Sequence, residues 1–329
     1  MIKMKAIVMT AAGDSDVLSY QENRDKPVNE GVSLKIKAAG VNPIDTKVRA
    51  FNMFYPDNQA CILGCDFAGE VLVAAGDFSV GDKVWGCHGG LGREQGSYAE
   101  YNTIKSAYLA LMPKTLSFVE AAAAPLVLIT AWGALYERGR LQAGETVLIH
   151  AGAGGVGHVA IQLAKLKGAR VITTVSTPEK AAFVRECGAD EVILYTEENV
   201  LERVLGLTEG EGADLVFDTV GGDVLADSIE MTKHYGRLVT LLSAEGIDLS
   251  EARMRNLSVA FELMLTPMLR DLETERAKHI AILNQCASLI DTGKLKIKVS
   301  QVLPLQEAKQ AHDIIESGHS LGKIVLEMA

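Results

Sequence analysis

The sequence lacks a long apolar stretch, an excess of basic residues and the features of a signal peptide. Its most apolar stretch, residues 121–135, contains Pro125 and is too short to cross a bilayer. Because 42 Asp and Glu outnumber 32 Lys and Arg, the net charge of −10 argues against nucleic acid or an anionic membrane as a partner. The basic N-terminal segment lacks the apolar stretch of a signal peptide. We therefore expect a cytoplasmic protein with no membrane or nucleic-acid partner.

Cysteine is also scarce, and its distribution argues against a disulfide framework. The five cysteines of the 329-residue chain are scattered, and they are Cys61, Cys65, Cys87, Cys187 and Cys286. Apolar residues make up 48% of the chain and charged residues 22%, so it can bury a core without disulfides. The length predicts about two domains.

The first third contains short apolar runs separated by Gly and Asp, which is typical of a mostly antiparallel β unit. The expected strands there are residues 5–9, 32–38, 69–73, 83–85 and 99–102. Ser117 and Glu120 have the spacing of a helix capping box, and strands and helices alternate after them. The expected strands of this part are residues 146–150, 170–175, 191–194, 214–218 and 237–242, with helices that include 156–167 and 224–233. This α/β alternation predicts a doubly wound parallel sheet.

The tail follows a different pattern and could pack back on the first domain. We expect helices at residues 275–292 and 305–317, and strands at residues 296–302 and 322–327.

The most specific motif follows the first expected parallel strand. Gly152, Gly154 and Gly157 form G-x-G-x-x-G between a strand and a helix, the context in which this motif binds a dinucleotide. The glycines permit a tight turn, a close approach of the pyrophosphate, and close packing of helix on strand. Gly155 and Val156 lie at the helix N-terminus, whose free N–H groups favour an anion. A turn rich in glycine only for packing is the alternative.

The end of the second parallel strand favours NADPH over NADH. A carboxylate about 20 residues after the glycines would bind a free ribose 2′-hydroxyl. Ser176 lies at this place, 19 residues after Gly157, and no carboxylate ends the strand. Ser176 and Lys180 are spaced to meet a 2′-phosphate, although Lys180 alone could be a solvated helix lysine.

Three segments and the C-terminal strand identify a family. Residues 38–45 (AAGVNPID), 64–71 (GCDFAGEV), 121–157 and 322–326 (GKIVL) resemble the zinc-free medium-chain dehydrogenases/reductases of the quinone oxidoreductase, or zeta-crystallin-like, family. The resemblance covers essentially the whole chain. It implies a GroES-like β-rich catalytic domain from residues 1–122 and 265–329, and a Rossmann NADP-binding domain at residues 123–264. It also implies an active site in the cleft between these domains.

The resemblance further implies that the chain binds no metal. Zinc-dependent relatives use a Cys, a Gly-His-Glu motif and a further Cys or Asp, and they carry a lobe with four close cysteines. In this sequence Ala39 and Gly40 occupy the first Cys position, Cys65 occupies the His position, and residues 84–101 contain only Cys87. A structural zinc needs about four converging ligands and a catalytic zinc about three.

Several cofactor-binding residues are implied by their positions in the family pattern. Asn42 resembles the asparagine that lines the nicotinamide and substrate site, and Thr130 resembles a threonine that meets the nicotinamide region. Tyr195 resembles the tyrosine near the adenine ring, and Ser243 and Lys323 match further cofactor-lining positions. Asn42 and Thr130 could instead satisfy backbone groups, and Tyr195 could be a strand-end aromatic.

The function implied is hydride transfer from NADPH to a quinone or an α,β-unsaturated carbonyl, with Asn42, Lys47 and Tyr55 as candidate catalytic residues. Lys47 departs from relatives that have tyrosine at this position, whereas Tyr55 resembles a second active-site tyrosine. Asp45 is expected behind the site, because a free carboxylate would repel the anion formed. A zinc-free alcohol dehydrogenase is an alternative that lacks a Lewis acid. The other alternative is a non-enzymatic NADPH-binding structural or regulatory protein.

The resemblance also implies a homodimer paired through the edge of the Rossmann sheet. Residues 257–267 (LSVAFELMLTP) are apolar and prone to form a strand, which is a poor choice for an exposed edge. A strand buried within one subunit is the alternative.

Overall fold

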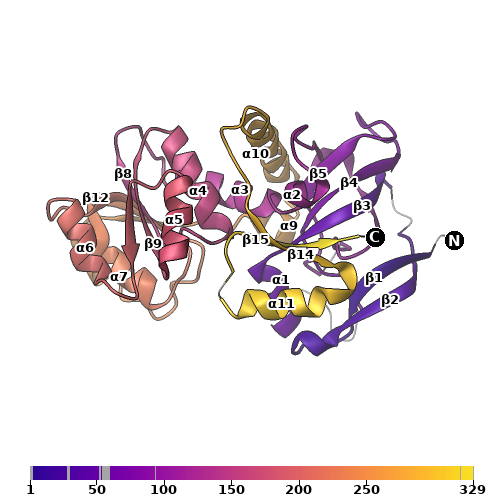
Figure 1. Cartoon of the computed structure of the whole chain (residues 1–329), viewed down its shortest axis with the longest axis horizontal. Coiled ribbons are helices and arrows are strands. Elements are labelled where there is room, and N and C mark those ends of the chain that lie inside the picture. Colours follow the sequence, from indigo (N-terminus) through magenta and orange to yellow (C-terminus); the bar gives the residue numbers. More distant parts are fainter. Residues whose placement is uncertain are drawn as a thin grey trace. The chain divides into compact units, whose positions relative to one another are not determined.

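A computed structural model of the chain describes residues 3–27, 30–51, 53, 60–92, 94–318 and 320–328. The chain divides into unit 1, formed by Met1–Leu126 and Leu265–Ala329, and unit 2, formed by Val127–Met264. Both ends of the chain therefore belong to unit 1, as the colours of Figure 1 show. No helix among the described residues is long and apolar enough to cross a membrane.

Unit 1 is built around a seven-stranded mixed sheet. Its principal path has the order β14-β15-β3-β4-β5-β7, and β6 pairs with β3. The strands of this sheet are β3 (Val32–Val41), β4 (Asp66–Val73), β5 (Lys83–Cys87), β6 (Tyr101–Ile104), β7 (Ala110–Leu111), β14 (Val299–Pro304) and β15 (Lys323–Glu327). A two-stranded sheet is formed by β1 (Lys3–Met9) and β2 (Leu18–Asp25). The helices are α1 (Pro43–Phe51), α2 (Phe118–Ala122), α9 (Thr266–Leu269), α10 (Glu273–Asp291) and α11 (Ala308–Glu316), with single 3-10 turns at Ser15–Val17, Ser106–Tyr108 and Leu305–Glu307.

The central strand β3 explains why the two ends of the chain fold together. It pairs antiparallel with β4 and also with β15, where Ile324 faces Val41 and Val325 faces Gly40. A β-carbon at Gly40 would lie 2.3 Å from the carbonyl oxygen of Ala122, so glycine allows α2 to lie directly against the strand. Phe67 and other buried apolar side chains fill the core around this sheet.

Unit 2 is a parallel six-stranded sheet with the order β10-β9-β8-β11-β12-β13, the strand order of a Rossmann fold. The strands are β8 (Thr146–Ile149), β9 (Arg170–Val175), β10 (Glu191–Leu194), β11 (Ala213–Asp218), β12 (Thr232–Thr240) and β13 (Ser258–Phe261). The helices are α4 (Gly155–Leu166), α5 (Pro178–Glu186), α6 (Val200–Leu207), α7 (Asp223–Met231) and α8 (Ser250–Met254), preceded by α3 (Pro125–Trp132) and a π-helix at Gly133–Arg138. Figure 1 shows α4 and α5 on one side of this sheet and α6 and α7 on the other.

The predicted α/β fold class, with a β-rich unit and a doubly wound parallel sheet, is confirmed. Several element boundaries were wrong. The helix expected at residues 224–233 ends at Met231, because Thr232 already begins β12. The strand expected at residues 99–102 begins at Tyr101. The apolar segment 257–267 is a strand only at Ser258–Phe261, and it enters α9 at Thr266.

Candidate functional site

The glycine-rich turn joins β8 to α4, and two of its glycines lie where no side chain fits. A β-carbon at Gly152 would lie 2.0 Å from the Thr173 hydroxyl oxygen, and one at Gly157 would lie 2.4 Å from the carbonyl oxygen of Ala151. Both glycines therefore permit the close packing of helix on strand. Gly154 is the N-cap residue of α4. The first N–H groups of a helix have no partner within it, so this turn can bind an anion such as a pyrophosphate.

The carboxyl end of β9 adjoins this turn, because Gly152 donates its N–H to the carbonyl oxygen of Thr174 at 3.1 Å. Thr177 caps α5 by accepting the N–H of Lys180 at 3.2 Å. Ser176 therefore lies just before α5 and Lys180 lies in its first turn, and both are partly exposed. This arrangement offers a hydroxyl and an ammonium, with no carboxylate at the strand end, to a group bound beside the turn.

The other predicted cofactor residues of unit 2 are spread over three elements. Tyr195 follows β10, donates its N–H to the carbonyl oxygen of Val175 at 3.1 Å, and is 52% exposed. Ser243 follows β12, and its hydroxyl accepts the N–H of Glu245 at 3.2 Å. These residues lie at the carboxyl ends of parallel strands, where dinucleotides bind in such sheets. Thr130 is instead buried in α3.

In unit 1, Asn42 belongs to a buried polar network beside the start of α1. Its side-chain amide donates to Asp66 at 2.9 Å, and its side-chain oxygen accepts from the Lys323 ammonium. Lys323 also donates to the carbonyl oxygen of Val41 at 3.0 Å, and Asp45 accepts the backbone N–H of Asn42 at 2.8 Å. All four side chains of the network are buried. The amide of Asn42 is thus held through both of its polar atoms, which fixes its orientation.

One cation and two carboxylates set the charge of this network. Lys323 Nζ lies 3.7 Å from Asp66 Oδ2. Burial raises the pKa of Asp66, and the Lys323 charge opposes this shift. Burial also raises the pKa of Asp45 to about 7, so this carboxyl is partly protonated at neutral pH. Burial lowers the pKa of Lys323, which its two carboxylate neighbours oppose.

The network does not fit a zinc ion. The Cys65 thiol donates to Asp45 at 3.9 Å, yet no cluster of three His, Cys, Asp or Glu among the described residues could hold a metal. The hydrogen bond to Cys87 and burial raise the pKa of Cys65 well above its usual value, so the thiolate that zinc requires is disfavoured. The Lys323 ammonium beside Asp66 would also repel a second cation.

Sequence reasoning missed the residues that support Asn42 from behind. Asp66 was part of a recognised segment, but its contact with Lys323 depends on the pairing of strands from opposite ends of the chain. Tyr98 donates its hydroxyl to Asp45 at 3.1 Å, and its oxygen lies 3.3 Å from His312 Nε2. No spacing in the sequence brings residues of the loop before β6 and of α11 together.

Of the two predicted catalytic residues Lys47 and Tyr55, the structure describes only Lys47. Lys47 is exposed on α1, whereas Asp45 two residues earlier is buried, so the structure does not bring Lys47 into the Asn42 network. Tyr55 lies outside the described residues.

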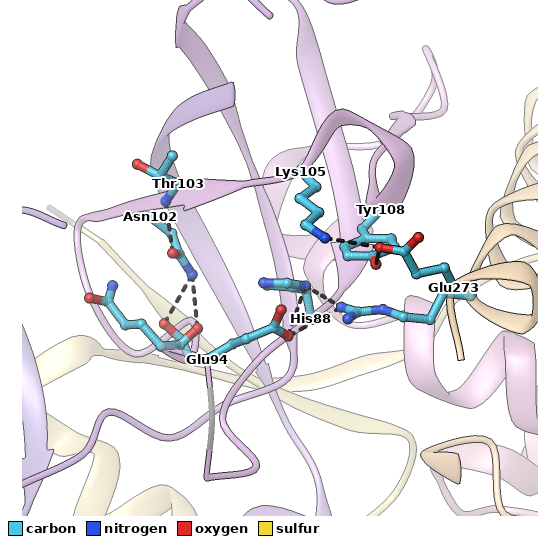
Figure 2. A network of polar contacts seen from close by, with 10 residues as sticks. His88, Glu94, Asn102, Thr103, Lys105, Tyr108 and Glu273 are labelled. Atoms are coloured by element: carbon cyan, nitrogen blue, oxygen red, sulfur yellow. Dashed lines mark hydrogen bonds and ion pairs between the residues drawn. The ribbon is translucent and has the colours of Figure 1, made fainter. Parts of the chain in front are cut away.

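A second polar cluster of unit 1 joins the loop after β5 to α10 (Figure 2). Arg276 donates to His88 Nδ1 at 2.6 Å and to Glu94 at 3.3 Å, and its guanidinium lies 3.5 Å from the centre of the Tyr108 ring. Because a guanidinium can only donate, His88 accepts through Nδ1 and carries its proton on Nε2. Burial and the Arg276 charge lower the pKa of His88 to about 3. These contacts fix α10 against the loop.

Comparisons with known proteins agree with this geometry. Residues 29–114 match the alcohol dehydrogenase GroES-like domain, and residues 187–326 match a domain described as zinc-binding dehydrogenase. Quinone oxidoreductase of Pseudomonas aeruginosa is 35% identical over 98% of this chain and 99% of its own length. The chain belongs to the quinone oxidoreductase family of the medium-chain dehydrogenases/reductases. It is therefore an oxidoreductase that uses a nicotinamide cofactor.

Other relatives and solved structures extend this comparison. A 2-haloacrylate reductase of a Burkholderia species is 31% identical over 98% of both chains. Escherichia coli quinone oxidoreductase, solved in complex with NADPH, has a TM-score of 0.87 and 30% identity over 98% of this chain and 99% of its own. An alcohol dehydrogenase superfamily protein of Novosphingobium aromaticivorans has a TM-score of 0.90 and 32% identity over 99% of this chain and 100% of its own.

Proposed function

We propose that this family member reduces quinones or α,β-unsaturated carbonyls with NADPH and without a metal ion. The observation that carries the proposal is the glycine-rich turn with Ser176 and Lys180, and no carboxylate, at the end of the adjoining strand β9. The solved Escherichia coli relative is described with NADPH, and the name 2-haloacrylate reductase denotes an acceptor with a conjugated double bond.

The proposed cofactor contacts divide between binding and positioning groups. In unit 2 the N–H groups of Gly155, Val156 and Gly157 would bind the pyrophosphate beside Gly152 and Gly154. Tyr195 would lie near the adenine, and Thr130 and Ser243 would contact the nicotinamide half. In unit 1 Asn42 would orient the nicotinamide and the acceptor, while Lys323 would act through Asn42, whose amide oxygen it contacts.

NADPH, when bound, supplies a hydride to the electron-poor carbon or oxygen of the acceptor. The protein's task is to position the acceptor and stabilise the enolate or hydroquinone anion with a hydrogen-bond donor, which typically contributes about 2.7–4 kcal/mol. The second N–H of Asn42 would be such a donor, and Lys47 and Tyr55 are further candidates. Asp45 would remain behind Asn42, since its carboxylate already accepts three hydrogen bonds, from Asn42, Tyr98 and the Cys65 thiol.

Single-turnover oxidation of NADPH with a quinone, an enone and a simple ketone tests the proposed reaction. We expect oxidation with the first two acceptors only, because their conjugation delocalises the developing charge. Lys47→Ala and Tyr55→Phe should each lower the rate about tenfold, whereas Asn42→Ala should lower it further. Tight binding of NADPH without oxidation by any acceptor would favour a non-enzymatic role instead.

The choice of cofactor has a separate test in Lys180→Ala. A charge-assisted hydrogen bond to the 2′-phosphate is worth roughly 1.5–3 kcal/mol, so the Kd of NADPH should rise by about one to two decades. The Kd of NADH should barely change, because NADH lacks this phosphate. Equal losses for both cofactors would reject the role of Lys180, and a wild-type preference for NADH would reject the NADPH assignment.

A further inference from the structure

Ala151, the first residue of the glycine-rich turn, has a backbone conformation that needs support. Its φ of 52° lies in the left-handed region, which is unfavourable for a residue with a β-carbon. Its carbonyl oxygen accepts the N–H of Gly154 at 3.0 Å and lies where a β-carbon of Gly157 would be. The conformation of Ala151, which sets the direction of this carbonyl, therefore positions the second and third glycines of the motif.

Three buried side chains form a row of hydrogen bonds that begins at the N–H of Ala151. The N–H of Ala151 donates to the Thr174 hydroxyl at 3.2 Å, and this hydroxyl lies 3.2 Å from His150 Nδ1. His150 Nε2 lies 3.1 Å from the Ser228 hydroxyl, which donates to the carbonyl oxygen of Val224 at 2.6 Å. His150, Thr174 and Ser228 are at most 3% exposed.

The direction of every hydrogen bond in this row follows from its last member. The Val224 carbonyl can only accept, so it takes the single proton of Ser228. Ser228 must then accept from His150, which places the imidazole proton on Nε2. Burial lowers the pKa of His150 to about 4, so the ring is neutral and Nδ1 accepts the Thr174 proton. The lone pairs of Thr174 are thereby turned toward the N–H of Ala151.

We infer that His150, Thr174 and Ser228 are positioning residues for the dinucleotide, because they anchor the N–H of Ala151, the residue whose conformation shapes the glycine-rich turn. This inference rests on the proposed binding of the cofactor at that turn. A proton on His150 Nδ1 would leave Nε2 without a donor, because the one proton of Ser228 goes to the carbonyl oxygen of Val224.

Thr174→Val tests the inference, because it keeps the shape of the side chain but removes the hydroxyl. We expect the Kd of NADPH to rise about tenfold or more, while Thr174→Ser, which retains the hydroxyl, should bind NADPH within about twofold of wild type. Ser228→Ala should have an intermediate effect. Thr208→Val is the matched control, because Thr208 also accepts a backbone N–H in unit 2, from Gly212 at 2.9 Å at the end of α6. It should lose stability and leave the Kd unchanged.

The position of the imidazole proton gives a second measurement that needs no cofactor. The ¹⁵N resonances of the full-length wild-type protein, assigned by their loss in His150→Gln, should report a neutral ring with the proton on Nε2. A proton on Nδ1, or equal Kd values for Thr174→Val and Thr208→Val, would overturn the inference. Failure of wild-type protein to bind NADPH or NADH would instead overturn the proposed function, whereas the tautomer would still be testable.

Discussion

At the scale of single residues, the most informative finding is that Lys323 places a buried ammonium beside Asp66 and Asn42. A buried charge is tolerated only when it is paired and hydrogen-bonded, and this network meets both conditions. It also supplies positive charge at a place where a metal cation would need negative ligands.

The first prediction is therefore that the purified protein contains no stoichiometric zinc. Elemental analysis should detect well below one zinc per chain, and a chelator should change neither the melting temperature nor the oxidation of NADPH. Cys65→Ser should leave the metal content unchanged, because its thiol has a raised pKa and is a poor ligand. Detection of about one tightly held zinc per chain, with activity lost to the chelator, would contradict this prediction.

His88 provides a prediction about pH. Its pKa is about 3 in the folded protein and about 6.5 in an unfolded chain, so the unfolded state binds one more proton between these values. The stabilising contribution of neutral His88 is fully present above pH 6.5 and is lost as the pH falls toward 3. His88→Gln keeps an acceptor for Arg276 and cannot titrate.

Urea unfolding at pH 7 and pH 5 should therefore show a smaller loss of stability in His88→Gln than in wild type, by about 2 kcal/mol, which corresponds to one proton over 1.5 pH units. His234→Gln is the control, because His234 is exposed. Identical pH dependences for wild type and His88→Gln would show that burial and the Arg276 charge do not keep His88 neutral.

At the scale of helices and strands, local sequence signals predicted much of the fold. The capping box of Ser117 and Glu120 and the Thr177 cap are both present, because they depend on residues within one turn. The apolar run that forms β8 is buried, as expected of a strand covered on both faces. The boundary between α7 and β12 could not be predicted, since the helix passes into the strand without a glycine or proline.

The edge strand β13 carries a prediction about assembly. It pairs only with β12 among the described strands, and Phe261 and Leu263 at its end are 54% and 51% exposed. An apolar edge of this kind favours pairing with a second copy. We predict a homodimer that Phe261→Lys dissociates.

Each copy in a twofold interface contributes the same contact, so Phe261→Lys removes two apolar contacts. At about 1.5 kcal/mol or more for each contact, the dimer Kd should rise by about two decades. Light scattering at micromolar concentration measures this shift. Met254→Lys, on α8 of the same unit and 73% exposed, should leave the mass unchanged. A monomeric wild-type protein would remove the basis of this prediction.

At the scale of the whole molecule, the sequence alone could predict the glycine-rich turn but only some residues of the unit 1 network. The turn is contiguous, and its glycines are required by contacts within one strand–helix connection. The unit 1 network forms only because α11 and β15, from the end of the chain, join strands from its beginning. This pairing brings together Asn42, Asp66, Tyr98, His312 and Lys323. The resemblance pointed to Asn42 and Lys323, but the partners that hold them follow from tertiary pairing.

This topology leads to the last prediction, for a chain that ends after Met264. Unit 1 would lose β14 and β15, so the edge of β3 that pairs with β15 would be exposed. Asp66 would also lose the Lys323 ammonium. Removing one member of a buried ion pair typically costs about 3–5 kcal/mol, a large part of the 5–15 kcal/mol that stabilises a domain.

Unit 2 contains all six strands of its own sheet within Val127–Met264. Hydrogen exchange should therefore show loss of protection in β3–β5 and persistence in β8–β12, whereas Lys323→Met in the full chain, which loses the ion pair but keeps β14 and β15, should show only reduced protection in unit 1. Protected β3–β5 amides in the truncated chain would mean that the first 126 residues fold without the C-terminal strands.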